Sequence, residues 1–144
     1  MIIGFSAQIQ NASRKFDVFD TIIYETVHYN HGHGYNSTSG VFTAPVYGDY
    51  MVHATGYTYS KNSFKPNYFT IRVGDMVNTI GISSFDENSS YVSVVASAVL
   101  FLFKGEELAV FNSAEDAWWS GGSFSACLLT TGFEDELPND EPTY

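Results

Sequence analysis

The stretch Val-Ser-Val-Val-Ala-Ser-Ala-Val-Leu-Phe-Leu-Phe-Lys at positions 92–104 decides the fold class. Its β-branched and aromatic residues favour a β-strand, in which successive side chains point to opposite faces. Both alternating sets are apolar here: one ends in Leu100 and Leu102, the other in Phe101 and Phe103. Two packed sheets bury only one face of each, so the second apolar face needs another cover. Self-association would supply it; loops of the same chain, folded over a central strand, are the alternative.

The rest of the chain also has the composition of β-strands. Short runs of β-branched and aromatic residues are separated by clusters of Gly, Asn, Ser and Pro, and no segment has a convincing helical pattern. The pattern predicts an all-β protein, and we expect the second strand to break near Asp20. The predicted strands are Gly4–Ile9, Phe16–Tyr29, Gly40–Ala44, Asp49–Tyr59, Tyr68–Val73, Met76–Ile82, Val92–Lys104, Glu107–Phe111 and Phe124–Thr131.

Chain length and net charge limit the number of domains and the kinds of partner that we expect. The 144 residues fit one domain, which we place at 1–133, followed by an acidic and disordered tail at 134–144. The net charge of −10 disfavours nucleic acid and anionic surfaces as partners. The longest apolar stretch, 92–103, is too short to span a membrane, so no membrane insertion is expected. The start of the chain lacks the features of a secretory signal peptide.

Catalytic and metal-binding patterns are weak. The sequence has no Gly-x-Ser-x-Gly elbow and no phosphate-binding Gly-rich loop, so no enzyme activity is expected. His31 and His33 resemble the metal-binding pair of cupins, but a third ligand is lacking, and the glycines around them indicate a turn. We predict no metal site. Cys127, followed by two leucines, is predicted to be a buried apolar residue rather than a reactive thiol.

One set of spaced residues matches a family signature: an aromatic, five residues, Asn or Asp, four residues, an aromatic, six residues, Phe, five residues, then Gly-x-Tyr. The residues at these spacings are Tyr24, Asn30, Tyr35, Phe42, Gly48 and Tyr50. The sequence therefore resembles the globular-head domain of complement C1q, over residues 4–133. Val52 and Ala54 stand where the family has aromatics, which implies a divergent member with a differently packed core.

The resemblance implies a ten-stranded jelly-roll β-sandwich of the C1q/tumour necrosis factor type that is secreted and assembles as a homotrimer. The collagen-like stalk of many relatives is absent from this sequence. Two functions remain open. The first is a soluble lectin or pattern-recognition protein of innate immunity that binds carbohydrate multivalently. The alternative is a trimeric secreted ligand or scaffold that binds a protein receptor.

The fold that the resemblance implies places three loops, at 60–66, 83–91 and 112–123, at the end opposite the C-terminus. The third loop holds both tryptophans, and neighbours in extended backbone point in opposite directions, so at most one easily enters the core. An exposed indole beside polar side chains suits a sugar ring. The alternative is that both tryptophans pack under the loops or between subunits. The candidate ligand-binding residues are Trp118, Trp119, Asp116, Glu115, Asp86, Asn88, Lys61 and Asn62.

Calcium is not expected to be required, and no cofactor is predicted. Many relatives have an aspartate before the long strand that helps to hold a calcium ion, and Val92 occupies that position here. Asp86 and Asn88 could contribute from upstream, but Ca²⁺ prefers six or more oxygen ligands and the sequence offers no such set.

Overall fold

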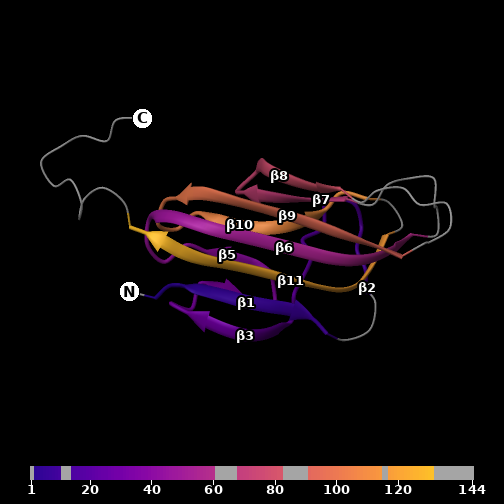
Figure 1. The fold of residues 1–144 in the computed structure, drawn as a ribbon, viewed down its shortest axis with the longest axis horizontal. Helices are drawn as coiled ribbons and strands as arrows, with labels where there is room; N and C mark the ends of the chain where they lie inside the picture. The colour runs from indigo at the N-terminus through magenta and orange to yellow at the C-terminus, as the bar shows by residue number, and fades with distance from the viewer. Residues whose placement is uncertain (1, 11–13, 61–67, 83–90, 115–116, 132–144) are drawn as a thin grey trace, which may run out of the picture.

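The computed structural model describes residues 2–10, 14–60, 68–82, 91–114 and 117–131 (Figure 1). These residues form strands and connecting segments without a helix, as the sequence pattern predicts. The strands are β1 (Gly4–Ile9), β2 (Arg14–Lys15), β3 (Thr26–His31), β4 (Tyr35–Asn36), β5 (Val41–Thr43), β6 (Gly48–Ser60), β7 (Tyr68–Val73), β8 (Met76–Ile82), β9 (Tyr91–Leu102), β10 (Glu107–Asn112) and β11 (Ala117–Thr130).

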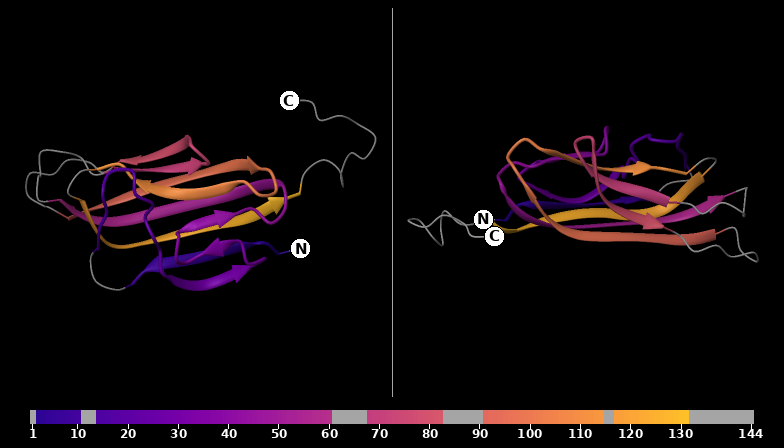
Figure 2. Two further views of the ribbon diagram at one scale, coloured as in Figure 1. Left: turned by 180° about the vertical axis from the view of Figure 1, so that it is seen from behind. Right: turned by 90° about the horizontal axis from the view of Figure 1, so that it is seen from above.

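The strands form two antiparallel sheets packed as a sandwich. Sheet I has the order β3-β1-β11-β6-β9, with β2 added at the start of β11, and this order runs from bottom to top in Figure 1. Sheet II has the order β4-β5-β10-β7-β8. Figure 2 shows the same two layers from behind and from above. The arrangement is the predicted jelly-roll sandwich, with eleven strands in the described residues rather than ten, two of which (β2 and β4) have only two residues.

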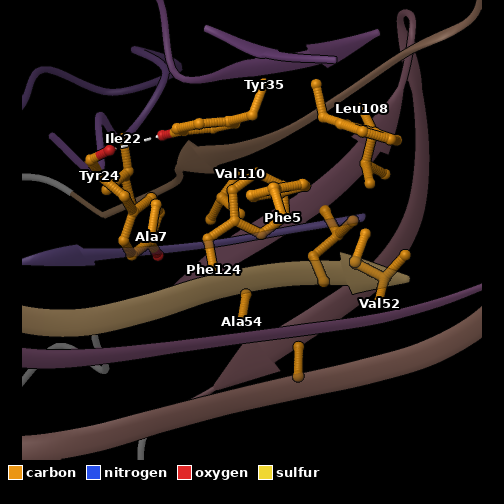
Figure 3. Packing of buried hydrophobic residues seen from close by; sticks show 14 of the residues in the cluster. Phe5, Ala7, Ile22, Tyr24, Tyr35, Val52, Ala54, Leu108, Val110 and Phe124 are labelled. Atoms are coloured by element: carbon orange, nitrogen blue, oxygen red, sulfur yellow. Dashed lines mark hydrogen bonds between the residues drawn. The ribbon is translucent and has the colours of Figure 1, made fainter. Parts of the chain in front are cut away.

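Aromatic rings pack together with aliphatic side chains in the space between the sheets (Figure 3). The ring of Phe5 stacks on Tyr35, with 4.4 Å between centroids, and meets Phe124 edge-on at 4.8 Å. The hydroxyl of Tyr35 donates a 2.7 Å hydrogen bond to the backbone oxygen of Tyr24. Burial raises the pKa of both tyrosines well above the usual value, because the buried site disfavours the charged phenolate.

The signature residues have structural roles. The side chain of Asn30 closes a turn by bonding both the backbone nitrogen and the backbone oxygen of Tyr35. Ala54, where the family has an aromatic, is buried opposite Phe124 in the register of β6 and β11. The large ring on the neighbouring strand therefore lies beside the small side chain.

Part of the outer face of sheet I is apolar, as the two apolar sets of the long strand predict. Val95, Val99 and Phe103 on or beside β9 are 55%, 59% and 65% exposed. Met51 of β6 is the register partner of both Val99 and Cys127, so the exposed apolar residues continue across three strands. The prediction that Cys127 is buried is wrong for the single chain: the thiol is exposed on this same outer face, because the inward positions of β11 belong to the alternate residues.

The predicted strand Phe16–Tyr29 is mostly not a strand. Only its end falls in β3, with an isolated bridge between Thr21 and Phe111. A turn interrupts it, in which the backbone nitrogen of Asp20 bonds the oxygen of Asp17 and the Asp20 carboxylate bonds the nitrogen of Asp17. Aspartate side chains favour such turns, so the break near Asp20 is confirmed and is longer than expected.

Candidate functional site

The strand ends that border the three predicted loops lie together at one end of the sandwich. Ser60 pairs with Ala117, Tyr59 with Tyr91, and Tyr68 with Ile82. This end, here called the apical end, lies opposite the start of β1 and the end of β11 (Figure 1). The predicted grouping is therefore confirmed at the level of the strands. Six candidate residues lie outside the described residues: Lys61, Asn62, Asp86, Asn88, Glu115 and Asp116.

The two tryptophans are not in a loop, which corrects the prediction of a loop at 112–123. Strand β11 begins at Ala117. Its first residues pair with the C-terminal end of β6 on one side and with β2 on the other. The register shifts between Trp119 and Gly121, and Gly122 has φ of 138°. A bulge at glycine bends the strand without ending it, and this explains why the glycine-rich segment has the composition of a loop.

Trp119 points into the core, so it is a structural residue rather than a ligand-binding one. It is fully buried, and its ring stacks on Phe69 with 5.6 Å between centroids and 13° between planes. Its indole Nε1–H donates a 3.1 Å hydrogen bond to Oδ1 of Asn112. A Cβ on Gly56 would clash with the Trp119 ring, so glycine is needed at that position of β6.

Asn112 fixes the buried indole in place, a role that the sequence analysis missed. The residue is fully buried at the end of β10. Its Nδ2 donates to the backbone oxygens of Phe16 and Ala114, at 2.9 and 3.0 Å, while Oδ1 accepts from Trp119. The side chain thereby connects three segments of the apical end. A polar amide directly after the apolar run 108–111 is the signal that could have found it.

Trp118 points the other way, onto the outer face of sheet I, and is partly exposed. It lies between Tyr59 of β6 and Lys15 of β2 in the sheet register. Two side-chain hydrogen bonds hold this part of β11 to β6: Thr58 Oγ1 donates to the backbone oxygen of Trp118 at 3.0 Å, and Ser120 Oγ donates to that of Tyr57 at 3.2 Å. The expectation that only one tryptophan enters the core is confirmed.

The surroundings of Trp118 suit a ligand with both an apolar face and polar groups. Tyr57 lies two residues before Tyr59 on the same face of β6 and is 46% exposed. Lys15 is the exposed register partner of Trp118 on β2. Neither residue could be predicted from the sequence, because the pairing of β2 with β11 joins segments about a hundred positions apart and leaves no local pattern. This indole with its neighbours on β2 and β6 is called the Trp118 site below.

The histidine pair lies at a turn, as its glycines predict: Gly32 and His33 both have positive φ. The imidazole of His31 packs on Tyr29, with 4.4 Å between centroids. Within the described residues, no three His, Cys, Asp or Glu side chains gather to hold a metal ion. Nor do those residues contain a helix long and apolar enough to cross a membrane.

Fold and site together define an antiparallel jelly-roll binding domain. A family model described as C1q domain matches residues 4–129, and the chain belongs to the C1q domain family. The globular domain of zebrafish complement 1qA is similar, with a TM-score of 0.73 and 16% identity, over 89% of this chain and 98% of that one. Murine APRIL at pH 8.0 is similar as well, with a TM-score of 0.66 and 14% identity, over 90% and 100%. No curated protein matches the sequence significantly.

Proposed function

We propose that the protein is a secreted carbohydrate-binding module whose ligand stacks on Trp118. The family and fold support a non-enzymatic binding domain. The proposal of carbohydrate binding rests on the different positions of the two tryptophans. Trp119 is fixed in the core, while Trp118 is held on the outer face beside Tyr57 and Lys15. An aromatic ring with polar neighbours binds the C–H face of a sugar and its hydroxyl groups.

We also propose that the part of the outer face of sheet I around Met51 and Val99, at the end of the sheet away from Trp118, forms the interface of a homotrimer. The exposed apolar residues of this part lie on three adjacent strands, and a contiguous exposed apolar patch often marks an interaction surface. Three copies would present three Trp118 sites, each weak by itself and useful through multivalency.

Replacing Trp118 with alanine should weaken binding to immobilised glycans. Loss of one stacked ring costs on the order of 1 kcal/mol per site, and three sites multiply this loss on a multivalent surface. Trp118→Phe, which keeps a ring, should retain part of the binding. The readouts are binding on a glycan array and, in the same samples, trimer mass by sedimentation. If Trp118→Ala dissociates the trimer instead, the indole is an interface residue and the proposed site is wrong.

Carbohydrate binding should survive a chelator. Val92 stands where relatives have a calcium-binding aspartate, so no required ion is expected. Array binding measured in EDTA and in millimolar calcium should be the same. Binding that EDTA abolishes and calcium restores would contradict this part of the proposal.

A further inference from the structure

A second feature lies on the outer face of sheet II, away from the Trp118 site. The guanidinium carbon of Arg72, on β7, lies 4.8 Å from the ring centre of Phe111 on β10 and 5.6 Å from that of Phe19. The cation thus contacts two aromatic rings. Its Nε–H donates a 3.1 Å hydrogen bond to Thr70 Oγ1, and among the described residues its terminal N–H groups have no further acceptor.

The position of Phe19 is costly for the fold. Its side chain is 63% exposed, and its backbone has φ of 72°, a left-handed conformation that is rare for a bulky residue. The backbone nitrogen of Phe19 donates a 2.6 Å hydrogen bond to the oxygen of Asn112, which holds it there. Strain kept at an exposed position is typical of a functional site.

The surroundings of this stack are apolar. Val77 and Ile80 on β8 are the register partners of Arg72 and Thr70, and they are 49% and 51% exposed. Register partners share a face of a sheet, so both aliphatic side chains lie next to the guanidinium. Arg72 is also the only Lys or Arg in the five strands of sheet II, in a chain of net charge −10. A cation framed by apolar side chains is therefore the distinctive feature of this face.

We propose that Arg72, Phe19 and Phe111, together with Val77 and Ile80, form a docking site for a protein partner through an acidic peptide segment. A carboxylate of the partner accepts hydrogen bonds from the terminal N–H groups of Arg72, whose plane the two rings orient. Apolar residues beside that carboxylate pack on Phe19, Val77 and Ile80. These aliphatic flanks favour a peptide over an acidic sugar, which would offer them mostly hydroxyl groups. The site lies on the opposite sheet from the face proposed to form the trimer and does not depend on carbohydrate binding.

The experiment selects short random peptides displayed on phage against the full-length protein and discards those that bind the variant Arg72→Gln equally well. Recovered peptides are then titrated by fluorescence anisotropy. We expect them to contain Asp or Glu next to an apolar residue and to bind Arg72→Gln at least about tenfold more weakly, since a charge-assisted hydrogen bond is lost. Lys104→Gln, which removes another exposed cation, is the matched control and should change affinity less than about twofold.

Phe19→Gly separates binding from folding. Glycine adopts positive φ without strain, so this variant should melt no lower than the wild type while its affinity for the selected peptides falls. Recovered peptides without acidic residues, or equal losses in Arg72→Gln and Lys104→Gln, would overturn the proposal. Failure to recover any Arg72-dependent peptide would also overturn it. If a polyuronate such as alginate, tested in the same titration, binds in an Arg72-dependent way and no peptide does, the site takes an acidic sugar and the proposal is wrong.

Discussion

Trp119→Ala should lower the free energy of unfolding by about 3–5 kcal/mol, the usual cost of truncating a buried tryptophan. The indole is fully buried against Phe69, and its loss would also remove one of the two donors to Oδ1 of Asn112, leaving only the backbone N–H of Ala114 at 3.3 Å. For a domain of this size the melting temperature should fall by roughly 10 °C or more. Thermal unfolding followed by circular dichroism measures the change.

Trp118→Ala is the matched control, since it removes the same side chain from the neighbouring position. Because this indole is on the outer face of β11, the melting temperature should change by only a few degrees at fixed protein concentration. Equal destabilisation by the two substitutions would show that both rings are structural and that the Trp118 site is wrongly placed.

Val99→Asp should dissociate the trimer while leaving the protomer folded. Val99 is 59% exposed in the single chain, at the centre of the apolar face and paired with Met51, so the substitution does not disturb the core. In the trimer it would bury three carboxylates, and each unpaired buried charge costs several kcal/mol. Sedimentation equilibrium should give about three times the 16.0 kDa chain mass for the wild type and about the chain mass for the variant.

Met76→Asp introduces the same charge on β8 of the other sheet, at a side chain that is 76% exposed, and should leave the trimer intact. A wild-type protein that sediments as a stable monomer at micromolar concentration would contradict both the proposed interface and the multivalency that depends on it.

The strand pattern could be predicted from the sequence because it rests on local alternation. In the 92–104 segment, both apolar sets appear in the structure, one in the core and one on the outer face of sheet I. The spaced signature from Tyr24 to Tyr50 was likewise readable, and its aromatics are buried as the resemblance implies.

The features that were missed depend on distant pairing. The segment 117–123 has the composition of a loop, yet β6 and β2 pair with most of it and a glycine bulge absorbs the irregularity. Lys15 reaches Trp118 only through that pairing. Cys127 has apolar neighbours in sequence, but it occupies one of the alternating positions of β11 whose side chains point outward. Local composition does not record which face a residue occupies when the register is set by a strand far away in the chain.

The proposed multivalent binding of carbohydrate by this C1q domain can be measured on a glycan array probed with the wild-type protein. Each glycan is printed at high and at low density. We expect binding to a restricted set of glycans at high density and a steep loss at low density, because individual sites are weak. A protein verified as a folded trimer that binds no glycan at either density would contradict it.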